Sequence, residues 1–149
     1  MNPDVLFKKY KRKFIKLLGK GPLDNFQLDK LGKELLGKKY LGTFAQDELP
    51  TKSGYLIINT DTSKNINSGE AHWVAIIQTA KTLYVYDSYG RMTKNVLKLI
   101  SKQTKKKIVD SKHDAERFGF TAICGHLSLS WLCVAHDLGI CKALTIWNK

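Results

Sequence analysis

The sequence predicts an α+β fold: a small, mostly antiparallel sheet packed against a central helix, with the N-terminal helices covering one side. Three observations predict it: a basic amphipathic pattern near the N-terminus, β-rich runs in the middle, and a long apolar stretch over residues 118–135. The chain has 149 residues, of which 43% are hydrophobic, enough for one compact domain with its own core. We expect a single domain over 1–149, with a basic helical part at about 4–37 and the sheet and core at about 40–149.

Two helices are predicted in the N-terminal part. The first is basic and amphipathic and runs from about Asp4 to Leu18, where glycines end it. Its apolar positions recur at helical spacing: Phe7, Tyr10, Phe14 and Leu17. The second helix begins after Asp24 or Asn25 as its N-cap and ends at Gly37. Its inward positions are Leu28, Leu31 and Leu35.

The middle of the chain predicts strands at residues 55–58, 73–78 and 83–87, the last two forming a hairpin. A helix near 93–102 and a short strand around 107–109 precede the central helix, which runs from Cys124 to His136. His72 opens the first hairpin strand and Asp87 closes the second. Because the start of one antiparallel strand lies beside the end of the next, we expect their side chains within hydrogen-bond reach.

Cys124 is a candidate nucleophile. It ends an apolar run and stands before Gly125 at the start of the central helix. A thiol at a helix N-terminus meets backbone N–H groups and the positive end of the macrodipole, which favour the thiolate. The same N–H groups, including that of Gly125, can hold an oxyanion.

Together, Cys124, His72 and Asp87 are the set that a cysteine hydrolase needs. Such enzymes use a thiolate, a histidine that pairs with it and protonates the leaving group, and a polar group that fixes the histidine tautomer. Cysteine and histidine are also common in protein cores, so these three residues alone leave ordinary packing as an alternative.

Five short segments strengthen the enzymatic interpretation. In chain order they are residues 40–44 (YLGTF), 57–60 (IINT), 72–75 (HWVA), 84–90 (YVYDSYG) and 122–125 (AICG). Together they resemble the adenain family of adenovirus maturation proteases, over about Leu41 to Cys133, and more broadly the SUMO-deconjugating proteases. Related enzymes are encoded by virophages and Polinton-type elements.

The resemblance implies an adenain-like cysteine-protease fold and a role for each site residue. His72 looks like the general base and acid, Asp87 like its orienting carboxylate, where the family has glutamate, and Cys124 like the nucleophile. Trp73 looks like the tryptophan that packs beside the site in this group. The implied function is a cysteine endopeptidase that cleaves viral capsid or core precursors beside small residues during virion maturation, in the virion and at the host-cell assembly site.

The chain departs from the family pattern in two places. The family places an oxyanion-donating glutamine six or seven residues before the nucleophile, where this sequence has Phe118 and Arg117. Either Arg117 donates instead, or backbone N–H groups such as that of Gly125 form the oxyanion hole alone. The family also carries a longer C-terminal extension, so we expect the surface for an activating peptide to be absent or rebuilt.

The charge of the chain predicts attraction to polyanions. Lysine and arginine number 25 against 13 acidic residues, a formal net charge of +12. The candidate DNA-binding residues are Lys8, Lys9, Lys11, Arg12, Lys13, Lys16, Lys105, Lys106 and Lys107. A solvated surface explains such clusters as well as a binding site does. The family uses viral DNA as a cofactor, so the resemblance implies non-specific DNA as an activator, with no cofactor required for the chemistry.

Other features narrow the class of protein. Three cysteines without a signal peptide predict free thiols in a reducing compartment, and their spacing with His136 fits no common structural zinc site, so no metal is expected. Polar residues interrupt the apolar stretch, which favours a soluble protein without a membrane partner. Two alternatives remain: a protease that removes ubiquitin-like modifiers, and a virion nucleic-acid-binding protein that keeps the fold without efficient turnover.

Overall fold

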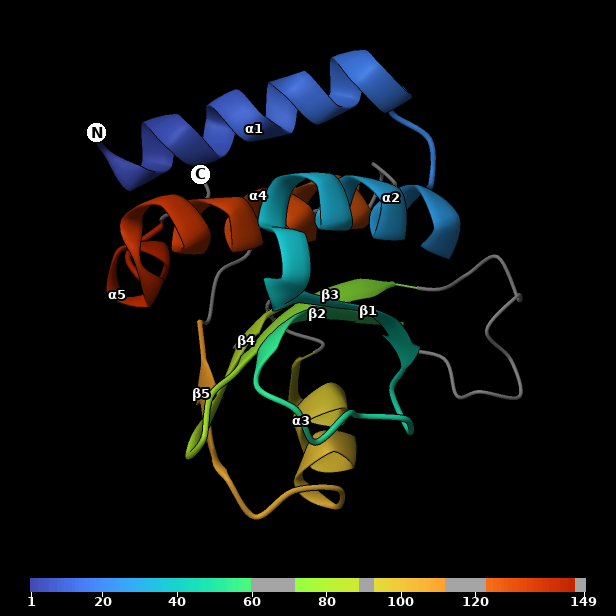
Figure 1. The fold of residues 1–149 in the computed structure, drawn as a ribbon, viewed down its shortest axis with the longest axis vertical. Helices are drawn as coiled ribbons and strands as arrows, with labels where there is room; N and C mark the ends of the chain where they lie inside the picture. The colour runs from blue at the N-terminus through green and yellow to red at the C-terminus, as the bar shows by residue number, and fades with distance from the viewer. Residues whose placement is uncertain (60–71, 89–92, 112–122, 147–149) are drawn as a thin grey trace.

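The computed structural model describes residues 1–59, 72–88, 93–111 and 123–146, with the backbone alone over 93–96. Its helices are α1 (Pro3–Leu18), α2 (Asn25–Leu36), α3 (Thr93–Ser101), α4 (Cys124–Leu138) and α5 (Ile140–Ala143), with a 3-10 turn at Gly37–Lys39. Its strands are β1 (Tyr40–Ala45), β2 (Gly54–Asn59), β3 (Trp73–Gln78), β4 (Thr82–Tyr86) and β5 (Lys107–Asp110). The predicted α+β class and the central helix are confirmed (Figure 1).

The strands form one mixed sheet in the order β1-β2-β3-β4-β5. β3 pairs antiparallel with both β2 and β4, whereas β1 and β5 each run parallel to their neighbour. The antiparallel arrangement that we predicted therefore describes the three central strands. The edge strands differ: a long connection that contains α3 brings β5 parallel to β4, and residues 46–53 bring β2 parallel to β1.

Helices cover both faces of this sheet. In Figure 1, α2 and α4 lie over one face, α3 lies over the other, and α1 lies on the far side of α4 from the sheet. The N-terminal helices were expected to cover the sheet, but only α2 does so. β3 is buried along its whole length because both of its faces meet helices. Its alternate residues join two cores, Ala75 and Ile77 on the α4 side and Val74 and Ile76 on the α3 side.

The N-terminal helices begin where the sequence predicts. Asp24 and Gln27 form a reciprocal capping box, with Gln27 N donating to Asp24 Oδ1 at 2.8 Å. One predicted apolar position was wrong, because Leu17 is 60% exposed. Leu35 is half-buried and packs against the core, as predicted. The buried stripe of α1 follows α4 through Leu6, Phe7 and Phe14, and position 17 turns away from it.

α4 is buried on every side. All residues from Cys124 to Ala135 are buried, because the sheet packs below the helix and α1 packs above it. A helix that is apolar all round needs such complete covering. Among the helices that the structure describes, none combines the length and apolarity needed to cross a bilayer. The N-terminus of this buried helix and the start of β3 define the candidate site.

Candidate active site

His72 and Asp87 form a buried pair at the end of the hairpin. Tyr86 of β4 pairs with Ala75 of β3, so Asp87, the next residue, lies beside the start of β3. His72 Nε2 donates to Asp87 Oδ1 at 2.5 Å, and the two side chains are 5% and 0% exposed. The proximity predicted from the hairpin is confirmed. Because Nε2 pairs with the carboxylate, proton exchange with a thiol would use Nδ1.

Cys124 lies at the first position of α4, next to the start of β3. The backbone N–H of Trp73 donates to Cys124 Sγ at 3.5 Å, so the sulfur contacts the peptide group that joins His72 to Trp73. The first backbone hydrogen bond of α4 runs from Leu127 N to Ile123 O at 2.9 Å. The amides of residues 124–126 therefore lie ahead of the helical ladder, at the end where helices attract negative charge. This end can stabilise both a thiolate and an oxyanion.

Trp73 joins three elements at the site. One turn after the nucleophile, Ser128 Oγ donates to Trp73 O at 3.1 Å, so both backbone polar groups of Trp73 contact α4. Its indole Nε1 donates to Leu23 O at 2.9 Å, in the segment between α1 and α2. The predicted packing of Trp73 beside the site is present in this arrangement. Trp73 thereby connects the strand that carries His72 to the helix that carries Cys124.

Gly125 fits a tightly packed space. A Cβ at this position would lie 3.2 Å from Trp73 Cδ1 and 3.3 Å from two atoms of Leu23. Such contacts are closer than ordinary van der Waals packing, so Trp73 and Leu23 would have to move by a few tenths of an ångström to accept a side chain. Glycine therefore allows the backbone of this turn to lie close to Trp73 and Leu23.

His126 connects the site to the end of α1. Its ring is fully buried, and Nε2 donates to Gly19 O at 2.7 Å. Burial lowers the pKa of His126, and this effect outweighs the hydrogen bond to the carbonyl of Gly19, which raises it. The neutral ring therefore serves as a structural donor.

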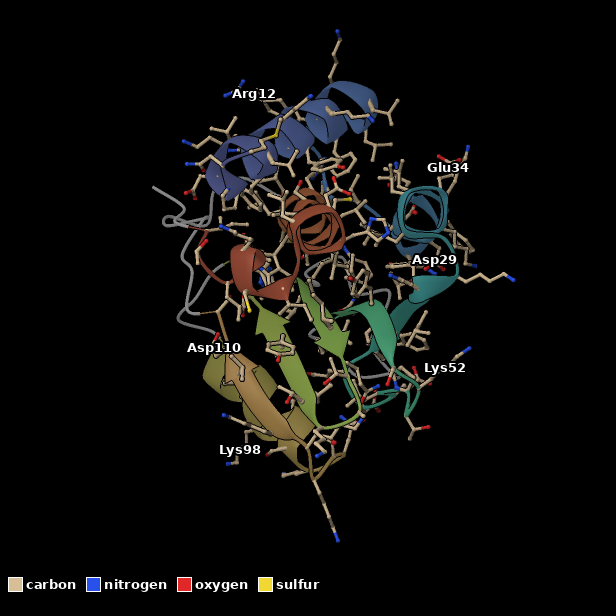
Figure 2. The ribbon with its side chains drawn as sticks, turned by 60° about the vertical axis from the view of Figure 1, so that its left-hand side comes forward. Arg12, Asp29, Glu34, Lys52, Lys98 and Asp110 are labelled. Carbon is tan, nitrogen blue, oxygen red and sulfur yellow. The ribbon has the colours of Figure 1, made fainter. Side chains whose placement is uncertain are left out.

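The remaining predicted residues lie elsewhere. Arg117 falls outside the described residues. Lys106 is tied down, because its Nζ donates to Thr79 O at 2.8 Å, and Lys11 is half-buried. The other cations of α1 are exposed on its outer face, where Figure 2 shows Arg12 pointing away from the rest of the fold. Within the described part of the chain, no group of three or more His, Cys, Asp or Glu residues could hold a metal ion.

The three cysteines differ in environment. All are free thiols; Cys124 and Cys133 are buried and Cys141 is exposed. Burial, with a smaller contribution from Asp137, raises the pKa of Cys133 to about 12. Cys133 is therefore a poor nucleophile, whereas Cys124 has the polar surroundings that a reactive thiol needs.

Sequence reasoning missed three residues at the site. Ser128 lies four positions after Cys124, and that spacing alone places its hydroxyl on the nucleophile's face of the helix. Leu23 precedes the capping box, a position where an apolar residue often fixes the entry of the chain into a helix. Asn59 is buried and pairs with Trp73 across β2 and β3, which only the strand register reveals.

Comparisons with known proteins give a similarity to solved structures and none to a family model or a curated protein. The chain is similar to the crystal structure of the ASFV pS273R protease, with a TM-score of 0.46 and 16% sequence identity. The similarity covers 79% of this chain and 58% of that protease, so this chain spans less than two thirds of the length of that protein.

Proposed function

We propose that this chain is a cysteine endopeptidase that uses Cys124, His72 and Asp87. One observation carries the proposal: the buried His72–Asp87 pair and the Cys124 sulfur meet at a helix N-terminus, with Sγ 3.5 Å from the amide that follows His72. A histidine, a carboxylate and a thiol gathered at the positive end of a helix are typical of a functional site. The arrangement supplies a nucleophile, a proton carrier and an orienting group in one place.

The proposed reaction has two stages. The Cys124 thiolate attacks the peptide carbonyl carbon, forming a C–S bond, while amides of residues 124–126 stabilise the oxyanion. The C–N bond then breaks, and the proton held by His72 goes to the departing amine. In the second stage a water molecule gives a proton to His72 and attacks the thioester, which releases the acid and restores the thiolate. Asp87 stabilises the imidazolium at each step.

We propose viral capsid or core precursors, cut beside small residues, as the substrates. The support for this step is the motif resemblance to the adenain family. The test uses quenched peptides with glycine-containing sites, capsid or core precursors, and a ubiquitin-like conjugate. Cleavage of the precursors and peptides supports the proposal, whereas selective cleavage of the conjugate supports the deconjugating alternative. Folded protein that cleaves none of them would support the nucleic-acid-binding alternative.

The variants for this test follow from the cysteine environments. Cys141→Ser removes the exposed thiol, and we expect it to leave cleavage unchanged. In this background, Cys124→Ser and His72→Ala should each lower the cleavage rate by about a thousandfold or more. A peptide probe with a thiol-reactive group should label Cys124 stoichiometrically, and should do so only while His72 is present. Equal labelling without His72 would contradict an ion pair between the Cys124 thiolate and the His72 imidazolium.

We further propose that α1 binds DNA through its exposed cations. Lys9, Arg12, Lys13 and Lys16 follow one another at helical spacing and form a continuous stripe, and the exposed Lys20 lies just after the helix. The cluster at residues 105–107 is a weaker candidate, because Lys106 is bound to a backbone carbonyl. The stripe suits contacts with backbone phosphates, which carry little sequence preference.

Charge reversal distinguishes the two clusters. A triple variant of α1 (K9E, R12E, K16E) should weaken DNA binding and lower any activation of cleavage by DNA. The matched control (K102E, K105E, K107E) makes the same change in net charge on another surface. For about four phosphate contacts, the logarithm of the affinity should fall with the logarithm of salt concentration with a slope of about −3.6. An equal loss in both triple variants would refute a site on α1.

A further inference from the structure

We propose that the segment between α1 and α2, residues 19–24, positions the active site by holding its two halves together. The inference rests on the proposed function. This segment, here called the linker, descends from the end of α1 to the start of α2 in Figure 1. Trp73, His126 and Leu23 are the positioning residues, and none of them carries out a chemical step.

The first contact holds the histidine half. Trp73 follows His72 in the chain, and its indole Nε1 donates a hydrogen bond to Leu23 O of the linker at 2.9 Å. The backbone N–H of the same residue contacts Cys124 Sγ at 3.5 Å. A shift of this indole would therefore move the peptide that joins His72 to the sulfur.

The second contact holds the nucleophile half. His126 lies two residues after Cys124 and donates to Gly19 O at 2.7 Å from a fully buried ring. Gly19 caps α1, with its N–H donating to Ile15 O at 2.8 Å and a φ of 79° that favours glycine. The Gly19 carbonyl that accepts the hydrogen bond from His126 is thus held in place at the end of a packed helix.

Between these two hydrogen bonds, the linker fills the space that separates strand from helix. Leu23 is buried, and its side chain lies against the backbone of Gly125 beside Trp73. At one end of the linker Gly19 caps α1, and at the other end Asp24 begins the capping box of α2. Both ends of the linker are anchored, so its contacts fix the distance between the two halves.

This arrangement matters because the two reacting groups come from different elements. His72 precedes β3 and Cys124 begins α4, and a misplacement of about 1 Å between reacting groups can cost about a hundredfold in rate. A linker that touches the neighbours of both groups can prevent such a shift. The prediction is that its hydrogen bonds affect the reactivity of Cys124 more than they affect stability.

The test compares two matched pairs of variants in the full-length chain. Trp73→Phe removes the indole donor at the linker. Trp131→Phe removes an equivalent buried donor further along α4, which bonds Ala143 O of α5 at 3.0 Å, and keeps a ring to stack on Tyr86. His126→Leu removes the donor to Gly19, whereas His126→Gln retains an N–H group that can reach the same carbonyl.

The readouts are the alkylation rate of Cys124 from pH 5 to pH 9, located by mass spectrometry, and unfolding in urea. At pH 6 we expect Trp73→Phe and His126→Leu to lower the rate by about ten- to a hundredfold. Trp131→Phe should stay within about twofold while losing a similar amount of stability, and His126→Gln should restore most of the rate. The peptidase assay should show lower kcat with little change in KM.

The outcomes separate this inference from the proposed function. If wild-type Cys124 reacts only as an ordinary thiol, and His72→Ala changes nothing, the proposed function itself fails. If the wild type is reactive but both tryptophan variants behave alike, or His126→Leu matches His126→Gln in folded protein, the linker has no positioning role.

Discussion

Replacing Asp87 with asparagine should reduce the reactivity of Cys124 without unfolding the protein. The substitution keeps the size of a fully buried side chain and removes its charge. A hydrogen bond to a charged group is worth about 1.5–3 kcal/mol, and one between neutral groups about 0.5–1.5 kcal/mol. The loss of about 1–2 kcal/mol corresponds to about five- to thirtyfold less thiolate–imidazolium pair. Turnover should fall further, because asparagine also favours the wrong imidazole tautomer.

The assay is the rate of Cys124 alkylation at pH 6, where an ordinary thiol with a pKa of about 8.5 is almost unreactive. Asp137→Asn is the matched control, because Asp137 also contacts a histidine, His136 Nδ1 at 3.2 Å, but at the surface. We expect the control to react like the wild type. An Asp87→Asn variant that alkylates at the wild-type rate at pH 6, with unchanged stability, would refute the argument.

Three further predictions concern packing and pH. Gly125→Ala should cost about 1–3 kcal/mol of stability in urea and lower cleavage, because its Cβ would lie 3.2 Å from Trp73; wild-type activity would contradict the tight fit. Because the pKa of His126 is lowered by folding, the unfolded chain takes up a proton at a higher pH than the folded chain does. The free energy of unfolding should therefore keep its full value above about pH 6.5 and fall as pH drops through the folded pKa. His126→Gln should make the free energy of unfolding less dependent on pH in this range, and an unchanged pH dependence would contradict the prediction. Phe14→Ala should cost about 3–5 kcal/mol in urea, against about 0.5 kcal/mol or less for the exposed Leu17→Ala; similar losses would mean that α1 does not pack as described.

Local patterns were sufficient to predict most helices and the central strands. The hairpin placed His72 beside Asp87 because antiparallel pairing is set by sequence distance and a short turn. The start of α4 followed from the apolar run that Gly125 interrupts. These features depend on near neighbours in the chain, which is why the sequence alone predicts them.

Long-range contacts were harder to predict. β1 pairs in parallel with β2, a pairing for which the sequence carries no turn signal. The linker contacts join Leu23 to Trp73 and Gly19 to His126, residues 50 and 107 positions apart. The burial of Leu17 was predicted wrongly because helical spacing identifies an apolar stripe on α1 but does not show how far along that stripe α4 covers it. Such details depend on how elements dock, which local propensities do not determine.

The packing of α1 on α4 has a consequence for synthesis of the chain. Roughly a hundred residues separate the end of α1 from the start of α4, so α1 emerges from the ribosome long before its partner exists. During that interval the apolar side of α1 has no native surface to cover it. The dense positive charge on its other side should keep the nascent segment apart from identical copies by mutual repulsion. The same lysines can thus protect the growing polypeptide from aggregation before they meet any polyanion.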